Sequence, residues 1–399
     1  MATPPFDRDV VVVGGCGRVG LPLGIAFAQA GLRTTAFDIN PTAVAIVNSA
    51  TMPFDEPDSG WRLTEVSANG IFDASTDPMI LTTAEHVIVV VGTPVDEHLN
   101  PDPQVVRDSI KGVAEHLRDG QLLVLRSTVF PGVTRLVEEF IESTGLDIDV
   151  SFCPERIAEG KAFVELSELP QIVSARSDRG VQRATQLFKH LAHETIVLEP
   201  EEAELAKLFT NTWRYIKFAA ANQLYMIANN YGLDFERIRE AVRYNYPRAN
   251  DMPGAGLAAG PCLLKDTMQL AAFHENNFSL GHASMMINEG LPLYVVGRME
   301  LQYDLKGMTV GLLGMAFKAE SDDIRSSLSY KLRRILRFKA GDVLCSDPYV
   351  ADPSFLPLDE VIARADVLVI GAPHQAYRDM VTDKPVVDMW NVRGQGVKI

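Results

Sequence analysis

Residues 10–40 read VVVVGGCGRVGLPLGIAFAQAGLRTTAFDIN. The stretch opens with a run of valines, passes through a glycine-rich turn into an apolar segment, and closes on a second short strand that ends at Asp38. Two buried strands with a helix between them, in this order, predict a strand–helix–strand unit with parallel strands. Such units are the repeats from which a doubly wound α/β sheet is built.

The glycine turn fits the spacing GxGxxG, in which each glycine has a physical task. Gly15 permits the tight turn, Gly17 lets the backbone approach a pyrophosphate, and Gly20 lets the helix pack against the strand. The turn, with Val19 inside it, directs the N-terminus of the helix at the phosphates. Asp38 is placed to bind the adenosine ribose hydroxyls and to repel a 2′-phosphate, so we expect NAD and not NADP. The alternative is a turn that serves packing only, with Asp38 as a cap.

Later segments extend this plan along the chain. Apolar runs alternate with helical segments, so a buried parallel sheet should continue to about residue 198. No Pro or Gly interrupts the chain between Pro200 and Gly232, which predicts one long helix with apolar surface for a partner subunit. Residues 309–347 then repeat the plan of the first forty residues and close on Asp347.

The predicted fold class is therefore α/β, with two Rossmann-like doubly wound domains joined by a long central helix. We place an NAD-binding domain at 1–198, a central helical dimerisation domain at 199–304, and the second Rossmann-like domain at 305–399.

Composition narrows the classes of function. The chain has 399 residues, of which 47% are hydrophobic and 22% charged, as expected for several globular domains. Its net charge of -15 repels nucleic acids and anionic membranes, so we expect neither as a partner. The first residues lack the pattern of a signal peptide and the apolar runs are short, so we expect a cytoplasmic protein. Four dispersed cysteines fit neither a disulfide framework nor a zinc site, and we expect no metal.

The segment Gly260-Pro261-Cys262-Leu263-Leu264-Lys265-Asp266 suggests a nucleophile. A thiol on a glycine-rich loop, with Lys265 nearby to favour the thiolate and Asp266 available to orient a group, suits covalent catalysis. The alternative is that Cys262 is a small residue of the hydrophobic core.

Lys207 and Asn211 lie four residues apart on the long helix and share one face, with Asn222 near the same stripe. In a cleft, the ammonium could stabilise a developing oxyanion and the amide could fix its geometry. Glu155 follows a predicted strand and could position water or a hydroxyl, as could Glu159. A solvated polar stripe and simple loop acids are the alternatives.

Seven segments in order resemble the UDP-glucose/GDP-mannose dehydrogenase family, NAD-dependent enzymes that oxidise a nucleotide sugar twice at C6. The segments are GGCGRVGLPLG, VGTPVDE, RSTVFPGVT, CPERIAEGKA, ELAKLFTNTW, AAGPCLLKD and GMAFKAESDDIRSS, and the resemblance runs almost from end to end. It implies NAD on the first domain, a UDP-sugar on the third, and a homodimer formed through the central helix.

The resemblance also implies roles for single residues. Cys262 would be the nucleophile, with Lys207, Asn211 and Asp266 around the reacting carbon, Glu155 linked to thioester hydrolysis, and Thr128 holding water or the sugar. The expected NAD-binding positions are Gly15, Gly17, Val19, Gly20, Asp38, Thr93, Thr128, Lys265 and Arg325. The expected substrate-binding positions are Glu155, Glu159, Lys207, Asn211, Arg248, Gly260 and Lys318, with Arg248 reaching into the neighbouring subunit.

The implied reaction is a four-electron oxidation of UDP-glucose or a UDP-N-acetylhexosamine to the uronic acid, through a thiohemiacetal and a thioester on Cys262. One alternative is a two-electron 3-hydroxyacid-type dehydrogenase, which also carries Lys-x-x-x-Asn on a helix. Another is a catalytically silent protein that binds nucleotide sugars. The sequence departs from the family at Asp388-Met389-Trp390, where many relatives have Asp-x-Arg, and Arg393 is a candidate to replace that arginine.

Overall fold

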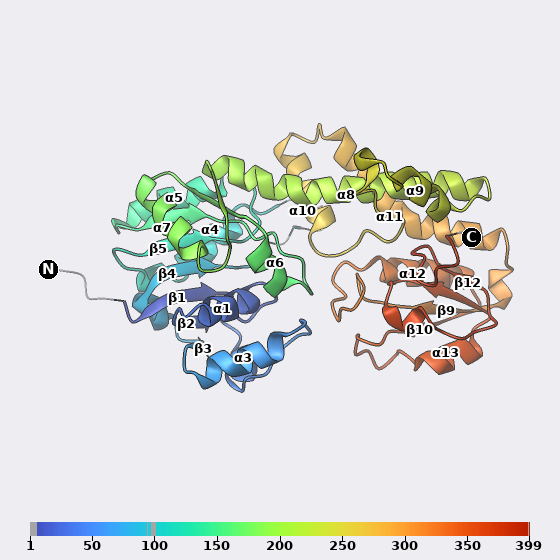
Figure 1. The fold of residues 1–399 in the computed structure, drawn as a ribbon, viewed down its shortest axis with the longest axis horizontal. Helices are drawn as coiled ribbons and strands as arrows, with labels where there is room; N and C mark the ends of the chain where they lie inside the picture. Colours follow the sequence, from blue (N-terminus) through green and yellow to red (C-terminus); the bar gives the residue numbers. More distant parts are fainter. Residues whose placement is uncertain (1–5, 94, 97–100, 398) are drawn as a thin grey trace. The chain divides into compact units, whose positions relative to one another are not determined.

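The computed structural model describes residues 6–93, 95–96, 101–397 and 399. The chain divides into two compact units, Met1–Thr210 and Asn211–Ile399. The division falls inside α8 (Pro200–Asn230), which Figure 1 shows as one unbroken helix. The predicted long helix is thus confirmed, while the division into three domains at 198 and 304 stays a prediction. In the part of the chain that the structure describes, no helix has the length and apolarity to cross a bilayer.

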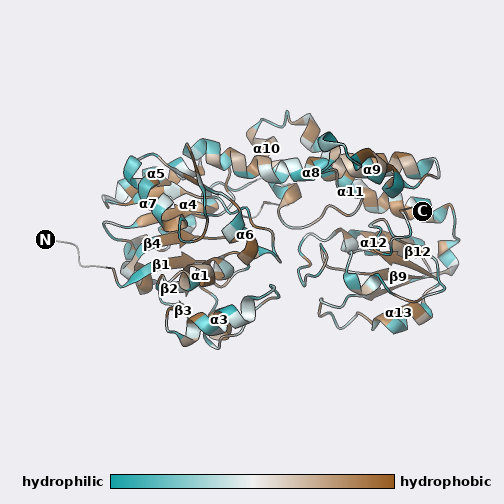
Figure 2. Cartoon of the chain, viewed as in Figure 1, coloured by the Kyte–Doolittle hydropathy of each residue, from teal (hydrophilic) through white to brown (hydrophobic). Residues whose placement is uncertain are grey.

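The first unit contains one sheet of eight strands in the order β3-β2-β1-β4-β5-β6-β7-β8. Its strands are rich in Val, Leu and Ile and are mostly buried, since helices cover both faces of a parallel sheet. Figure 2 shows hydrophobic colour along β1 and β4. The strands are β1 (Arg8–Val13), β2 (Thr34–Phe37), β3 (Phe72–Ser75), β4 (Ala84–Val89), β5 (Leu122–Leu125), β6 (Asp149–Phe152), β7 (Gln171–Ala175) and β8 (Thr195–Leu198).

The helices of this unit connect successive strands. They are α1 (Gly20–Gln29), α2 (Pro41–Asn48), α3 (Ser59–Ala68), α4 (Gln104–Lys111), α5 (Val133–Thr144), α6 (Ala162–Glu168) and α7 (Asp178–Phe188), with short 3₁₀ helices at Pro78–Thr83 and Ala114–His116. α4 ends at Gly112, and only a 3₁₀ turn follows, because glycine is a poor helix former.

One prediction about the sheet was wrong. The strands from β3 to β6 are parallel, but β7 pairs with β6 in the antiparallel direction, and β8 then runs parallel to β7. The chain leaves β6 at the carboxyl edge of the sheet, and the 18-residue connection that contains α6 ends near the same edge, since Phe152 pairs with Ser174 and Ser151 with Ala175. Therefore β7 begins beside the loop that follows β6 and runs back along it.

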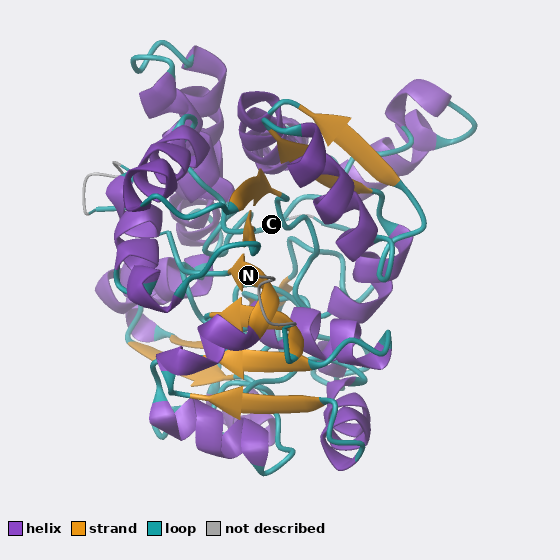
Figure 3. Ribbon diagram, turned by 90° about the vertical axis from the view of Figure 1, so that its left-hand side faces the viewer, coloured by secondary structure: helices purple, strands orange, loops and turns teal. Residues whose placement is uncertain are grey.

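The second unit repeats the doubly wound plan on a smaller scale. Its sheet of four parallel strands has the order β10-β9-β11-β12, with β9 (Thr309–Leu313), β10 (Asp342–Ser346), β11 (Val367–Ile370) and β12 (Val386–Val387). The helices are α9 (Phe235–Arg243), α10 (Leu263–Phe273), α11 (Ser279–Glu300), α12 (Leu328–Lys339) and α13 (Leu358–Arg364), with 3₁₀ helices at Pro247–Ala249, Leu305–Gly307 and Gln375–Tyr377. Figure 3 shows strands flanked by helices. The predicted α/β class is confirmed.

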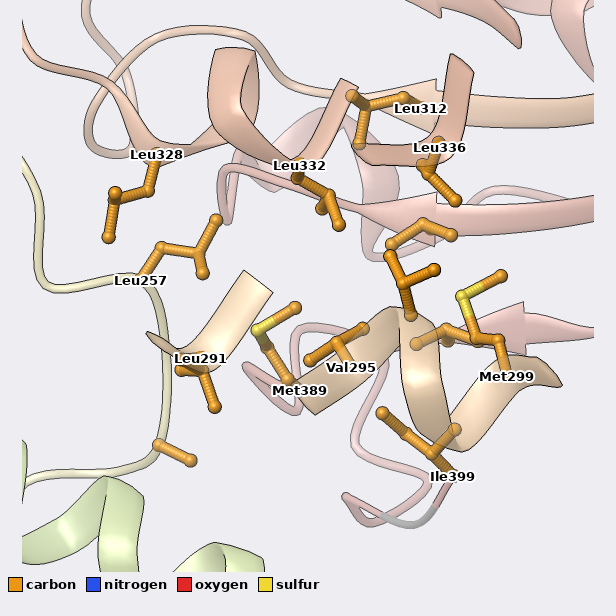
Figure 4. Close-up of a cluster of buried hydrophobic side chains, with 14 of the residues drawn as sticks. Leu257, Leu291, Val295, Met299, Leu312, Leu328, Leu332, Leu336, Met389 and Ile399 are labelled. Atoms are coloured by element: carbon orange, nitrogen blue, oxygen red, sulfur yellow. The ribbon is translucent and has the colours of Figure 1, made fainter. Parts of the chain in front are cut away.

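A single hydrophobic cluster ties α11, α12 and the small sheet together. Figure 4 shows Leu332 and Leu336 of α12 facing Val295 and Met299 of α11, and all four side chains are fully buried. Burying side chains of this size stabilises a fold by about 1.5–3 kcal/mol each. Leu257, which lies five residues before Cys262, belongs to the same cluster.

Candidate active site

The glycine loop after β1 has the shape that a dinucleotide requires. A Cβ added at Gly15 would lie 2.6 Å from the Cα of Ala36, and one at Gly20 would overlap the carbonyl oxygen of Gly14, so both positions need glycine for packing. At Gly17 an added Cβ would meet only the carbonyl of Gly14, at 3.5 Å, which leaves that side open. Val19 offers no side-chain cap to α1. Pro22 has no N–H, and the N–H groups of Leu21 and Leu23 donate to the carbonyls of Gly17 and Val19, so in this turn the N–H of Gly20 is the one placed for a phosphate oxygen. These residues fit NAD.

Asp38 lies directly after β2 and is tied to the same loop. Its Oδ2 accepts the N–H of Cys16 at 3.2 Å, and its Oδ1 accepts the N–H of Asn40 at 3.0 Å. The carboxylate is only partly buried. Its place beside the glycine loop suits the contact with ribose hydroxyls that the sequence predicts.

Three predicted residues follow neighbouring strands at the carboxyl edge. Thr93 comes after β4, Thr128 after β5 and Glu155 after β6, and these strands are adjacent in the sheet. The hydroxyl of Ser127 accepts the N–H of Val91 and donates to its carbonyl, both at 2.8 Å. This pair of bonds fixes the loops that carry Thr93 and Thr128 against each other. Of the segment VGTPVDE, Pro94 and Glu97 lie outside the described residues.

Glu155 is held in a buried ion pair that sequence reasoning missed. Its Oε2 accepts a hydrogen bond from Nε of Arg126 at 2.8 Å, and its Oε1 accepts the N–H groups of Arg156 and Ile157. The guanidinium of Arg126 also donates to the carbonyl of Cys153 and lies 4.8 Å from the ring of Phe188. Arg126 closes an apolar run of strand residues, where the sequence gives no sign of a buried charge. The carboxylate thus shapes the loop, and its role in thioester hydrolysis stays a prediction.

Glu159 lies further along the same loop and pairs with the glycine turn. Its Oε1 is 2.7 Å from Nη1 of Arg18, whose guanidinium also lies over the ring of Phe54. The buried carboxylate of Glu56 accepts the N–H groups of Gly160 and Ala162 at the start of α6. The loop that carries Glu159 is therefore attached both to the NAD loop and to the segment before α3.

The first turns of α8 position Lys207, which is buried. Glu204 of α8 accepts the N–H groups of Gly132 and Thr134 and the hydroxyl of Thr134, at 2.6 to 2.8 Å, and so caps α5. Burial raises the pKa of Glu204, although these hydrogen bonds act in the opposite direction. The cap fixes Lys207 within the first unit relative to the loop after Thr128.

Cys262 differs from the other three cysteines. All four are described, none forms a disulfide, and only Cys262 is exposed. Burial raises the pKa of Cys16 to about 12 and that of Cys153 to about 11, and it also raises the pKa of Cys345. Cys262 stands at the N-terminus of α10. It is not a core residue.

Asn211 and Asp266 meet on the second unit, where Asp266 follows Cys262 by one turn of α10. Nδ2 of Asn211 donates to Oδ2 of Asp266 at 2.5 Å, and the ammonium of Lys265 lies 3.2 Å from Oδ1 as an ion pair. Asp266 is fully buried, and its Oδ1 accepts no aligned hydrogen bond, so the ammonium of Lys265 is the charged group that faces this oxygen. The structure thus brings Asn211, Lys265 and Asp266 together, about one turn of α10 after Cys262, and their roles stay predictions.

The remaining predicted positions of the second unit lie on loops. Gly260 has a φ of +103°, and an added Cβ would lie 2.7 Å from the ring of Phe317, so only glycine fits. Nζ of Lys318 lies 5.5 Å from that same ring. Arg325 forms a two-pronged pair with Asp323, and Arg248 is exposed and donates to the hydroxyl of Tyr246. Their roles toward NAD, substrate or a second subunit stay predictions.

Near the C-terminus, where the sequence departs from the pattern of many relatives, Trp390 and Arg393 donate hydrogen bonds to backbone carbonyls. Trp390 lies against Gly256, and its Nε1 donates to the carbonyl of Gly371 at 3.2 Å. The guanidinium of Arg393 donates to the carbonyl of Met380. Among the described residues, no three His, Cys, Asp or Glu side chains are grouped so that they could hold a metal ion.

Known proteins match this chain over almost all its length. Residues 9–192 match the NAD binding domain of the UDP-glucose/GDP-mannose dehydrogenase family, residues 201–289 its central domain, and residues 311–395 its UDP binding domain.

Individual relatives agree with these domain matches. The UDP-N-acetyl-D-mannosamine dehydrogenase of Pyrococcus horikoshii is 29% identical over 382 residues, which cover 93% of this chain and 90% of that protein. The NDP-N-acetyl-D-galactosaminuronic acid dehydrogenase of Ralstonia solanacearum is 28% identical, and the match covers 97% of this chain and 98% of that protein. The structure of a UDP-glucose dehydrogenase from Pyrobaculum islandicum superposes with a TM-score of 0.89 at 26% identity, over 97% of this chain and 95% of that chain.

The resemblance drawn from the seven sequence segments is therefore confirmed by matches to all three domains in order. With a glycine loop that fits a dinucleotide, the chain belongs to the UDP-glucose/GDP-mannose dehydrogenase family and is a nucleotide-sugar dehydrogenase with NAD as its cofactor.

Proposed function

We propose that this protein oxidises the C6 hydroxymethyl group of a UDP-N-acetylhexosamine to a carboxylate in two NAD-dependent steps, with Cys262 as the nucleophile. The observation that supports this most is the exposure of Cys262 at the N-terminus of α10, one turn before the pair formed by Asp266 and Asn211. A thiol retained only for packing would be buried, as the other three are.

NAD⁺, when bound, accepts the two electrons and the hydrogen lost from C6 in each oxidation. In the first step, a base takes the proton of the C6 alcohol, and Oδ1 of Asp266 suits that task directly or through one water. The product is an aldehyde. The thiolate of Cys262 then adds to its carbonyl carbon and gives a thiohemiacetal.

Oxidation of that thiohemiacetal gives a thioester on Cys262. The amide of Asn211 and the ammonium of Lys207 supply donors for the negative oxygen of the intermediate. Water then adds to the thioester, the C–S bond breaks, and the carboxylate leaves while the thiol is restored. Thr128 and Glu155 are the residues that we propose to place this water.

The choice of an N-acetylhexosamine follows the relatives. The proteins from Pyrococcus horikoshii and Ralstonia solanacearum are named for N-acetylated sugars, whereas the structure from Pyrobaculum islandicum belongs to a UDP-glucose dehydrogenase. We also propose a homodimer. On the second unit, α8 exposes Trp213, Leu224 and Ile227, and Tyr231 follows it, apolar side chains that a second copy would cover.

One experiment tests the reaction and the substrate together. UDP-glucose, UDP-galactose, UDP-GlcNAc, UDP-ManNAc and GDP-mannose are each supplied with NAD⁺, and NADH is counted per sugar consumed. We expect two NADH per sugar and a kcat/KM at least ~100-fold higher for one N-acetylhexosamine, which equals about 2.7 kcal/mol of transition-state binding. One NADH per sugar would favour the two-electron alternative, and a preference for UDP-glucose would overturn the choice of substrate.

A further inference from the structure

The segment before Cys262 is anchored in the core of the second unit, although its sequence is that of a loop. Ala255, Leu257 and Ala258 are buried, while Cys262 is exposed. Figure 4 shows Leu257 between Leu328 and Leu291. The exposed thiol therefore projects from a backbone whose preceding residues are enclosed.

Asn222 of α8 holds this backbone at Gly256. Its Nδ2 donates to the carbonyl of Gly256 at 3.0 Å, and its Oδ1 accepts the N–H of Gly256, also at 3.0 Å. Both backbone groups of one residue are thus paired with one side-chain amide. Asn222 is fully buried and Gly256 is buried, so loss of the amide would leave a buried donor and a buried acceptor without partners.

A second asparagine fixes which way the amide of Asn222 points. Nδ2 of Asn222 also donates to Oδ1 of Asn288 at 2.9 Å, and Nδ2 of Asn288 donates to the carbonyl of Tyr215 at 3.1 Å. Tyr215 and Asn222 belong to α8 and Asn288 to α11. A reversed amide of Asn222 would set two oxygens against each other at both contacts, so the network permits one orientation.

Aromatic rings close the segment from another side. A Cβ added at Gly256 would overlap the indole of Trp390, and the hydrogen bond from Trp390 to Gly371 fixes that ring. At Gly260 the N–H donates to the carbonyl of Ser326 at 3.3 Å, against the ring of Phe317. The backbone is thus fixed at two glycines within the six residues before Cys262.

From this geometry we propose that Asn222, Asn288 and Trp390 are positioning residues, which set the place of the Cys262 thiol relative to Asp266 by fixing Gly256. The inference deepens the proposed function and rests on it. None of the three acts on the reacting atoms; each acts through the backbone that leads to the nucleophile. Buried hydrogen bonds fix a register that apolar packing alone would leave free to slide, and a displacement of about 1 Å can cost ~100-fold in rate.

The chain provides a matched control in Asn229. It lies two turns after Asn222 on α8, is also fully buried, and also reaches α11, where its Nδ2 donates to the hydroxyl of Tyr294 at 3.1 Å. Its Oδ1 accepts the N–H of Ile399 at 2.9 Å. Asn229 therefore fixes the C-terminal residue and not the segment before Cys262.

The test compares Asn222→Leu with Asn229→Leu in the full-length protein. Three quantities are measured: the midpoint of thermal unfolding, the rate at which iodoacetamide alkylates Cys262 between pH 6 and 9, and kcat and KM with the preferred UDP-sugar. We expect similar losses of thermal stability in both variants, because each leaves buried backbone groups unpaired. Only Asn222→Leu should change the alkylation rate by about 5-fold or more and lower kcat by ~10-fold or more, with KM for NAD little altered.

Alkylation and kcat like those of Asn229→Leu would overturn the inference. If Asn222→Leu does not fold, Trp390→Phe replaces it, since that change keeps the amide network and removes part of the ring. Trp390→Phe should shift alkylation and kcat in the same direction by ~3-fold, and an unchanged thiol would again overturn the proposal. Alkylation needs no substrate. A wild-type protein that forms no NADH would therefore defeat the proposed function and still leave the contrast between Asn222 and Asn229 measurable.

Discussion

The amide of Asn211 donates a 2.5 Å hydrogen bond to Oδ2 of Asp266, and Oδ1 of that fully buried carboxylate is left without an aligned hydrogen-bond donor. Residues 55 positions apart in the chain therefore meet as an oriented pair one turn of α10 after the exposed thiol. A carboxylate held in this way is restricted in its orientation, and its second oxygen lies 3.2 Å from the ammonium of Lys265.

This pair predicts that Asp266→Asn lowers kcat by ~100-fold or more, because an amide cannot accept the proton of the C6 alcohol. Asn211→Ala should lower kcat by about 10- to 100-fold through loss of an oxyanion donor. Steady-state kinetics with the preferred UDP-sugar measure both effects. Thr210→Ala is the control, since the hydroxyl of Thr210 bonds within its own helix, to Ala206. Equal kcat values for Asp266→Asn and the control would contradict the assignment.

Substitution of Cys262 by serine should separate the two oxidations. A hydroxyl is a far weaker nucleophile than a thiolate at neutral pH, so the reaction should stop after one NADH per sugar or trap a covalent adduct at position 262. The Cys262→Ser variant is followed by counting NADH per sugar and by mass spectrometry of the intact protein.

The control for this substitution is Cys345→Ser, because that thiol is buried and belongs to β10, not to the segment around α10. It should form two NADH per sugar, as the wild-type protein does. Two NADH per sugar at the wild-type rate in Cys262→Ser would refute the role of the thiol.

The position of Asp38 predicts the selectivity of the cofactor site. Asp38→Ala removes the charge that opposes a 2′-phosphate, so the ratio of kcat/KM for NADP to that for NAD should rise by ~10-fold or more, about 1.4 kcal/mol. The comparison uses one UDP-sugar at saturation with each cofactor in turn. An unchanged ratio would show that another group sets the selectivity.

The buried pair of Arg126 and Glu155 predicts an asymmetry in stability. Arg126→Met leaves the Glu155 carboxylate buried without its partner and should cost about 3–5 kcal/mol of unfolding free energy. The double change Arg126→Met with Glu155→Leu should recover part of that loss, because no buried charge then remains. Urea unfolding at pH 7 measures both proteins. A double variant less stable than Arg126→Met alone would contradict this account.

The stability of the second unit should depend on pH through the carboxyl group of Asp347. Burial alone would raise the pKa of its carboxyl, but hydrogen bonds from His374 and from the N–H groups of Ala316 and Tyr349 outweigh it and lower the pKa to about 2. A depressed carboxyl pKa contributes stability above the pKa of the unfolded chain, about 3.9, and that stability is lost as the pH falls toward the folded value.

Accordingly, Asp347→Asn should lower the unfolding temperature by roughly 4 °C or more at pH 7, and the difference from wild type should shrink as the pH falls from about 4 toward 2. Scanning calorimetry at several pH values follows the change. Asp359→Asn, at an exposed site of α13, should have little effect at any pH. A difference that stays constant over the whole acid range would contradict the assignment.

Much of the fold could be predicted because its signals are local. The valine run, the glycine turn and Asp38 lie within one strand–helix–strand unit, and α8 shows its length by the absence of Pro and Gly. The direction of β7 could not be predicted in this way, since it depends on where an 18-residue connection containing the short α6 returns the chain. The local sequence does not determine the path of this connection between β6 and β7.

In the candidate site, too, only the features that depend on neighbouring residues could be predicted. Cys262, Asp266 and the glycine loop carry motifs, and these motifs can be recognised from neighbours in sequence. The residues that hold these motifs in place cannot be recognised in this way. Arg126 finds Glu155 29 residues later, and Asn222 finds Gly256 34 residues later, so only the folded chain brings these groups into contact.

Lys207 and Asn211 lie on α8 on either side of the point where the chain divides into its two compact units. Insertion or deletion of one residue between them would rotate one side chain by about 100° around the helix axis relative to the other. A flexible loop at this place would leave the angle between the two side chains undefined, whereas a continuous helix fixes that angle. A change in the number of residues in this turn therefore alters the angle between the side chains of Lys207 and Asn211, whereas a change in an exposed loop does not.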